Sequence, residues 1–302
     1  MSQLTSLWHY VNSSPNFVPS VVGIAAAFAG SWGAQIAILR RERRREITAN
    51  LNSLNESIAL CFTIANSFMA LKKQHLIGMV ERFRATEARF EFFSNEQQAR
   101  NEYNEVVNVF EFQAELHTLP LMKVQIDRLE KNVFEKLGLG MKSLALTVEL
   151  AKAIELLNAS IGERNNLIAK WYEGPRVSND AMLFRYLGVK VRDGADEKYK
   201  QTLFAIETYC NDCIFFSMHL AQYLNEQANR VRRKHRHHVF WRLPKVAEAD
   251  FSGAEAQSLI PDVQDYQSWL SAFRRHPTVG QKIREFFSRR KKPVIPLGSP
   301  EA

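Results

Sequence analysis

The side chains best suited to chemistry lie together between residues 230 and 238, where the sequence reads RVRRKHRHH. This run holds five basic residues and three histidines. It contains three overlapping R-x4-H pairs, of which Arg230 and His235 are the first. A histidine can exchange a proton near neutral pH, and a guanidinium can hold a phosphate through two parallel hydrogen bonds. The run therefore predicts a phosphate-binding surface and, in a reactive form, a site that cleaves phosphodiesters.

The R-x4-H spacing resembles the motif of the helical HEPN ribonucleases. That resemblance implies a catalytic histidine and a phosphate-contacting arginine, and here these roles fall on Arg230, His235 and His237. Val231 follows the first arginine, where the family often carries a polar residue. A second hypothesis is a clamp for nucleic-acid phosphates that does not cleave, and its residues would be Arg232, Arg233, Lys234 and Arg236. The third, which we favour, is a basic helix end that is stabilised by the helix dipole and faces solvent or lipid headgroups.

The remaining motifs predict neither catalysis nor a bound metal. Cys210 and Cys213 form a C-x-x-C pair, but tetrahedral zinc needs four convergent ligands and the sequence has no second pair of this kind. We therefore expect buried thiols at these positions. The glycines at 138 and 140 precede Lys142 without the spacing of a phosphate-binding loop, so they predict a helix break. We expect no cofactor and no metal ion.

An uncharged run of 23 residues, Phe17 to Leu39, predicts a single membrane-spanning helix that serves as a signal anchor. At about 1.5 Å per residue the run extends roughly 35 Å, which exceeds the ~30 Å hydrocarbon layer of a bilayer. No charged residue precedes it, and five arginines follow at once: Arg40, Arg41, Arg43, Arg44 and Arg45. This asymmetry predicts an external N-terminus, a cytoplasmic remainder and arginines that contact lipid headgroups. A bacterial inner membrane is the simplest location.

Small residues form a stripe along one side of this predicted span. Ala26, Gly30, Gly33 and Ala37 recur at intervals of four, three and four residues. Small residues at such intervals let two membrane helices approach closely. The stripe predicts association with a second copy or with another membrane protein.

Apolar periodicity predicts an all-α protein whose cytoplasmic helices form an antiparallel bundle. From Ile47 to Phe68 the apolar residues alternate at spacings of four and three, as in a coiled coil. We expect main helices over about 40–93, 94–118, 144–173 and 197–236, and shorter ones before 137 and over 181–187, 262–275 and 278–290. The predicted domains are a short external segment (1–16), the span (17–39), the bundle (40–243), a linker (244–261) and C-terminal helices with a basic tail (262–302).

These features favour a membrane-anchored interaction, assembly or regulatory module over an enzyme. Its expected partners are membrane lipids and either a second copy or another membrane protein, with nucleic acid as the less favoured choice. One alternative is a membrane-tethered effector that binds nucleic acid or cleaves RNA in the HEPN manner. The other is an effector that perturbs the membrane by assembling through its span.

Overall fold

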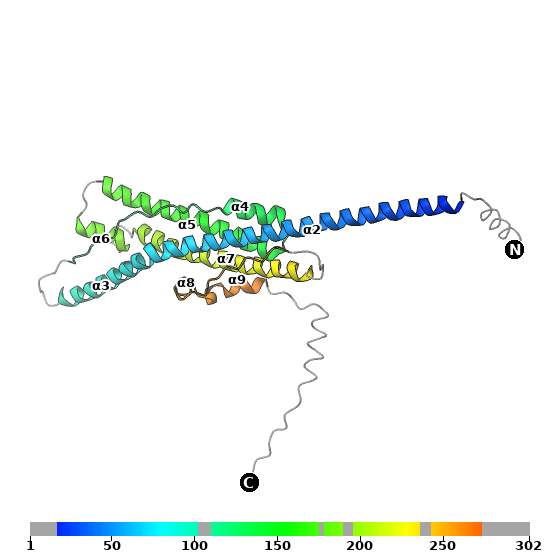
Figure 1. The fold of residues 1–302 in the computed structure, drawn as a ribbon. Helices are drawn as coiled ribbons and strands as arrows, with labels where there is room; N and C mark the ends of the chain where they lie inside the picture. Colours follow the sequence, from blue (N-terminus) through cyan, green and yellow to red (C-terminus); the bar gives the residue numbers. More distant parts are fainter. Residues whose placement is uncertain (1–16, 102–109, 175–177, 190–195, 236–242, 274–302) are drawn as a thin grey trace, which may run out of the picture. The chain divides into compact units, whose positions relative to one another are not determined.

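The computed structural model describes residues 17–101, 110–174, 178–189, 196–235 and 243–273, and these ranges contain helices but no strand. The chain begins with α2 (Phe17–Leu71), continues through a π-helical turn η1 (Lys72–Leu76) and enters α3 (Ile77–Asn101) without a break (Figure 1). Leu71 and Leu76 are both buried although their positions differ by five. A turn with i→i+5 hydrogen bonds keeps two such residues on one side of the helix. The π turn thus carries the apolar face of α2 into α3.

The sequence-based boundary between a first and a second helix at Ser94 is wrong. Ser94 lies inside α3, which continues to Asn101, and residues 110–125 contain no helix. The predicted helix over 94–118 therefore does not form as one element. Residues 102–109 of that range lie outside the described part.

The remaining long helices begin and end close to the residues that the sequence predicts. The short α4 (Ile126–Lys131) and η2 (Asn132–Lys136) precede α5 (Met141–Glu173), which is followed by α6 (Asn179–Leu187) and α7 (Lys198–Lys234). Gly138, with φ of +50°, separates η2 from α5, as the sequence predicts. Gly188 ends α6 in the left-handed conformation (φ +71°), which glycine adopts with little strain.

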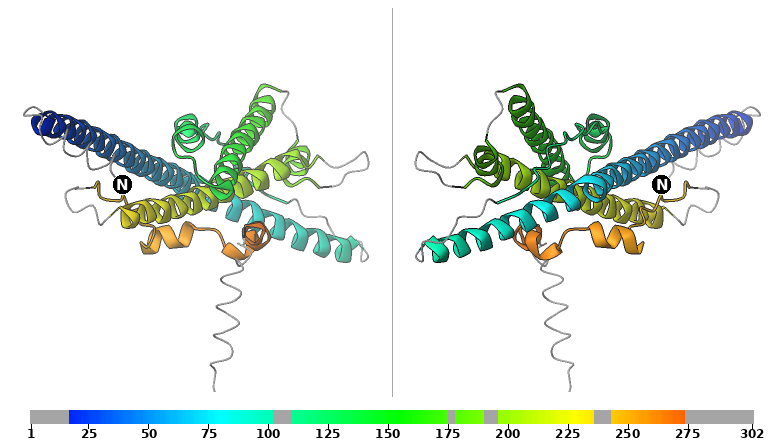
Figure 2. Two further views of the ribbon diagram at one scale, coloured as in Figure 1. Left: turned by 90° about the vertical axis from the view of Figure 1, so that its right-hand side faces the viewer. Right: turned by 90° about the vertical axis from the view of Figure 1, so that its left-hand side faces the viewer.

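Helix α7 is the central element and packs against both α2 and α5 (Figures 1 and 2). Six consecutive residues, 213–218, are buried, so α7 is covered on every side at its middle. The core comes chiefly from α2, α5 and α7. It includes Leu54 and Phe68 from α2, Leu150 from α5, and Leu203 and Leu224 from α7.

Contacts along α7 fix its direction relative to its neighbours. Lys72 Nζ donates to Asn211 Oδ1 (2.7 Å). Farther along the same two helices, Lys200 Nζ donates to Glu87 Oε1 (2.5 Å). Residue numbers therefore rise on one helix as they fall on the other, which makes α7 antiparallel to the α2–α3 rod. By the same reasoning α7 is antiparallel to α5, because the ring of Tyr223 lies by Lys142 and that of Tyr199 lies by Arg164. A closed four-helix bundle stays a prediction.

Polar side chains of α5 hold the extended segment 110–125, which we call the strap. Asn165 Oδ1 accepts the N–H of Leu119 (3.0 Å), and its Nδ2 donates to the Leu119 carbonyl (2.7 Å). Asn158 binds the N–H (2.8 Å) and the carbonyl (3.0 Å) of Met122 in the same way. These side chains take the place of helical hydrogen bonds, which explains why the strap is extended.

After α7 the chain runs back along α2. Asn55 Nδ2 donates to the Lys245 carbonyl (2.7 Å), and Asn55 Oδ1 accepts the N–H of Ala247 (2.8 Å). The ring of Phe251 lies 5.4 Å from that of Phe62, and α8 (Ala254–Leu259) follows. Residues from 261 onward form a separate compact unit, whose described part contains η3 (Val263–Tyr266) and α9 (Gln267–Ala272). The predicted helix over 278–290 lies outside the described residues.

Candidate functional site

The N-terminal part of α2 carries a long row of exposed apolar side chains. Phe28 is 72% exposed, Trp32 70% and Leu39 63%. In the described part of the chain, α2 and its continuation form one helix that is long and apolar enough to cross a membrane, near the N-terminus. Water-exposed apolar surface of this extent is rare on soluble proteins, so this stretch has the character of a lipid-facing or protein-facing surface.

The predicted small-residue stripe lies on this exposed stretch. Ala26, Gly30, Gly33 and Ala37 are all exposed, and a Cβ built on either glycine would meet no atom within 4 Å. Since an α-helix turns about 100° per residue, the four residues fall within about 60° of one another around the helix axis. The backbone is therefore open to close approach along this side.

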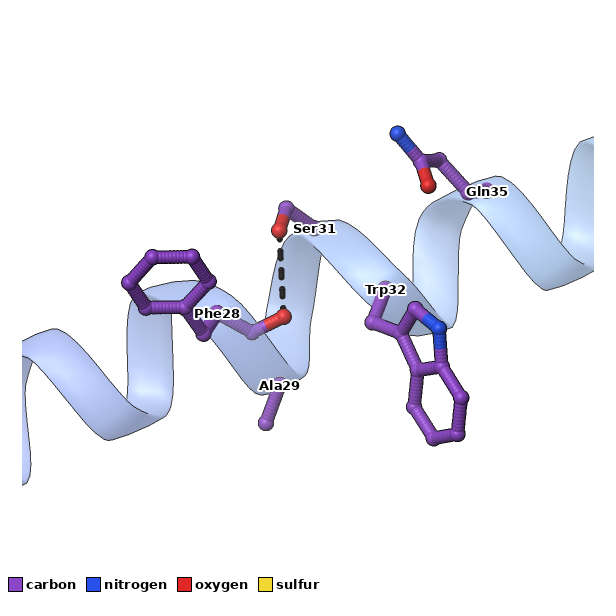
Figure 3. A pocket seen from close by; sticks show the side chains of 5 residues that line it. All are labelled: Phe28, Ala29, Ser31, Trp32 and Gln35. Atoms are coloured by element: carbon purple, nitrogen blue, oxygen red, sulfur yellow. Dashed lines mark hydrogen bonds between the residues drawn. The ribbon is translucent and has the colours of Figure 1, made fainter.

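The opposite side of the same helix has larger and more polar side chains. Phe28, Ser31, Trp32 and Gln35 border an open hollow of about 410 Å³ (Figure 3). Ser31 Oγ donates to the Phe28 carbonyl (3.0 Å), so the serine hydroxyl is satisfied within its own helix. Gln35 points outward with its amide and is the most polar group on this side (Figure 3). The two sides of the stretch thus offer different chemistry.

Burial along α2 changes abruptly after the arginine cluster. The five arginines of residues 40–45 are exposed, whereas Ile47 is 8% exposed and Leu51 is 1% exposed. The change comes eight residues, or about 12 Å, beyond the end of the apolar run at Leu39. One helix therefore contributes first a bare apolar stretch, then a ring of positive charge and finally the protein core.

The basic end of α7 lies beside this ring of arginines. Here a shallow hollow of about 300 Å³ lies between the two helices. It is bordered by Arg43, Glu46, Ile47 and Asn50 of α2 and by Val231, Lys234 and His235 at the end of α7. The structure thus brings together two basic clusters that are almost 200 residues apart in the sequence. Periodicity alone could not reveal this arrangement, because it depends on the register between α2 and α7.

Of the three R-x4-H pairs, only the first, Arg230 with His235, lies within the described residues. Arg230 is exposed and does not border the hollow, whereas His235 caps the C-terminal end of α7, borders the hollow and is half-buried. Five residues of α-helix correspond to a rotation of about 140° between the two side chains. Arg232, Arg233 and Lys234 are exposed, and Arg236 and His237 lie outside the described residues.

The C-x-x-C cysteines are buried in the core as free thiols, as is Cys61. Burial raises the pKa of Cys210 to about 12 against an opposing effect from Lys72, and burial also raises the pKa of Cys213. A thiol with so high a pKa is a poor nucleophile and a poor metal ligand at neutral pH. Within the described ranges, no group of three or more His, Cys, Asp or Glu side chains could hold a metal ion.

A polar cluster lies beneath the strap, and no sequence pattern indicates it. Arg164 is fully buried, and its guanidinium donates to the carbonyl of His117 (2.8 Å) and to the hydroxyl oxygen of Tyr199 (3.0 Å). The Tyr199 hydroxyl in turn donates to the Glu115 carbonyl (2.9 Å). The carboxylate of Glu115 faces Arg82 and the Nδ1 atom of His117. Because Arg164 and Tyr199 bind backbone carbonyls of the strap, the cluster anchors the strap.

Burial and charge also act on a histidine of α7. His219 lies 4.2 Å from the ring of Phe215, measured between ring centroids. Its pKa is lowered, first by burial and then by the nearby charge of Lys142. The folded protein therefore binds a proton at His219 less readily than the unfolded chain does.

No protein family matches this chain, and no curated protein or solved structure is significantly similar to it.

Proposed function

We propose that this chain is a single-pass membrane protein whose helical part acts as an interaction, assembly or regulatory module at the cytoplasmic face of the membrane. The change in burial along α2 is the observation that carries the proposal. Apolar residues from Val21 to Leu39 are exposed, except the half-buried Ile36, whereas the same helix supplies the core from Ile47 onward. Such an apolar stretch is stable within hydrocarbon and costly in water. One continuous helix would thus connect the bilayer to the folded part.

The orientation follows from charge. Positive residues are retained on the cytoplasmic side of a span, and here all five nearby arginines follow the apolar run. The N-terminus would lie outside and the folded part inside, with a bacterial inner membrane as the proposed location.

Fractionation of cells tests the anchor. Deletion of residues 1–39 should release the protein into the soluble fraction, whereas the full-length chain should resist extraction by alkaline carbonate. A deletion of residues 1–16 is the matched control, because it shortens the chain but keeps the apolar run, and it should stay in the membrane. Recovery of the intact protein in the soluble fraction would refute the proposal.

We also propose that the span associates through its small-residue stripe. The absence of any described atom within 4 Å of a Cβ on Gly30 or Gly33 supports close approach by another helix. Gln35, on the other side, would gain from a hydrogen bond to a neighbouring chain, because an amide in hydrocarbon has no water to bind. The membrane-perturbing alternative uses the same association and predicts that the assembled protein releases dye from vesicles.

Leucine substitution separates the stripe from the rest of the span. Gly30→Leu and Gly33→Leu should abolish cross-linked oligomers and leave membrane insertion intact, because leucine is more apolar but bulkier. Ala25→Leu is the matched control, since residue 25 lies about 100° around the helix from Ala26 and outside the stripe. Unchanged cross-linking in the glycine variants would show that other surfaces drive assembly.

The ribonuclease alternative depends on histidine chemistry. His235→Ala or His237→Ala would abolish RNA cleavage by a HEPN-like enzyme, whereas a phosphate clamp would tolerate these changes and weaken with salt or with arginine replacement. We expect no RNA cleavage by the full-length protein. Cleavage that disappears in the histidine variants would favour the enzyme over the interaction module.

A further inference from the structure

The two basic clusters adjoin at one end of α7, and we define them together as the basic shoulder. Its members are Arg40, Arg41, Arg43, Arg44 and Arg45 of α2 and Arg230, Arg232, Arg233 and Lys234 of α7. All nine side chains are exposed. The shared hollow bordered by Arg43 and Lys234 shows that the two groups lie next to one another.

We infer that the basic shoulder is one binding surface for anionic phospholipid headgroups, to which α7 contributes as well as α2. This inference rests on the proposed membrane span. It goes further, because it assigns the end of α7 a lipid ligand and explains why α7 ends in consecutive basic residues at this point of the fold.

The charge of the shoulder calls for an anionic partner. Residues 40–46 carry five arginines and two glutamates, and residues 230–234 carry four basic residues, which gives a net charge of +7. Like charges on adjoining helices repel one another and oppose the packing of α7 against α2. The α7 helix dipole offsets part of this repulsion. A layer of negative headgroups would offset much more.

The register between α2 and α7 sets the height of the shoulder above the bilayer. The hollow that α7 borders begins at Arg43, four residues or about 6 Å beyond Leu39, and ends at Asn50, about 16 Å beyond it. Headgroups occupy about 5–8 Å outside the hydrocarbon layer, and the Debye length at physiological salt is about 8 Å. The last turn of α7, with its long side chains, therefore lies within reach of the headgroups or of their surface potential.

Nucleic acid is the competing anion. It fits the charge of the shoulder but not its position, because a span that ends at Leu39 would bring the arginines of residues 40–45 against the bilayer. A duplex would then have to displace headgroups from the same surface. Charge and height together favour lipid.

Photo-cross-linking tests the inference on the full-length protein in nanodiscs. The probes are a phosphatidylglycerol and a phosphatidylcholine that carry the same photoreactive group near the headgroup, and mass spectrometry locates the adducts. We expect phosphatidylglycerol adducts on both the 40–45 and the 230–235 peptides, at least about fivefold above phosphatidylcholine adducts, since each basic residue near an anionic surface strengthens attraction roughly fivefold. Molar salt should reduce this preference on the α7 peptide.

Charge removal provides the matched pair of variants. Arg232→Gln/Arg233→Gln/Lys234→Gln should abolish the preference on the α7 peptide and keep that on residues 40–45. Lys152→Gln/Lys170→Gln/Lys198→Gln removes the same charge from exposed positions outside the shoulder and should change neither peptide.

The outcomes separate this inference from the proposed function. Adducts on residues 40–45 without any on α7, or equal labelling of α7 by both lipids, would overturn the shared surface and leave the span intact. No adducts on either peptide would count against the span itself. Loss of the α7 adducts on addition of RNA at physiological salt would overturn the inference in favour of nucleic acid.

Discussion

Asn165→Ala should loosen the strap without unfolding the rest of the protein. The asparagine makes two hydrogen bonds to the backbone of Leu119, a residue that is only 3% exposed. Each hydrogen bond contributes about 1 kcal/mol, and buried backbone groups left without a partner cost about 1–3 kcal/mol. Because water can reach part of the opened site, we expect a net loss of about 2–3 kcal/mol.

Hydrogen exchange measures this loss locally. A change of about 2–3 kcal/mol corresponds to roughly a 30- to 140-fold faster exchange of the Leu119 amide, if the strap opens independently of the core. The Met122 amide, held by Asn158, should respond less. Asn166→Ala is the matched control, since this neighbouring side chain on α5 is exposed and forms no part of the strap contact.

A second substitution tests the hydrogen bonds of Asn165 while keeping the size of its side chain. Asn165→Asp keeps an acceptor for the Leu119 N–H but cannot donate to the Leu119 carbonyl, so it should also accelerate exchange. Unchanged exchange in Asn165→Ala, or the same acceleration in Asn166→Ala, would refute the account of the strap.

Three further outcomes follow from glycine geometry, burial and charge. Gly188→Ala should lower the unfolding temperature, because φ is +71° there and a Cβ would lie 3.1 Å from the Cα atom of Glu197. Gly162→Ala, inside α5, places its Cβ where no atom lies within 4 Å, so it should raise the free energy of unfolding by about 0.5–1 kcal/mol. Unfolding temperatures at pH 7 and pH 5 test His219. Its folded pKa lies below the ordinary 6.5, so the unfolded chain binds the proton first and stability falls as the pH drops below 6.5. The fall should be smaller in His219→Gln. All three cysteines should resist maleimide at neutral pH until denaturant is added, and rapid labelling of the native protein would contradict their burial.

Long apolar periodicity made α5 and α7 predictable from the sequence. Their buried residues recur mostly every three or four positions, outside the fully buried stretch 213–218 of α7, and Gly138 and Gly174 mark the ends of the neighbouring segments. The same signal failed over 94–118, where Ser94 resembles a helix cap but continues α3. A single cap residue is a weak signal beside the helix propensity summed over the residues around it.

The polar contacts could not be predicted, because they depend on tertiary register. Asn158 and Asn165 are seven residues apart and so share one face of α5, a spacing that hints at a common role but not at their partner. Arg164 looks like an ordinary surface residue in the sequence, yet it is fully buried. The adjacency of Arg43 and Lys234 likewise depends on how α7 aligns with α2.

Site-specific labelling of a single introduced cysteine tests the central claim, that α2 crosses the membrane with the folded part inside. The native cysteines are buried, so an impermeant maleimide reports on the introduced thiol. In intact right-side-out vesicles Ser6→Cys should react at once, whereas Glu226→Cys, exposed on α7, should react only after the membrane is permeabilised. Labelling of Glu226→Cys in intact vesicles with protection of Ser6→Cys would reverse the orientation, and recovery of either variant in the soluble fraction would contradict the span.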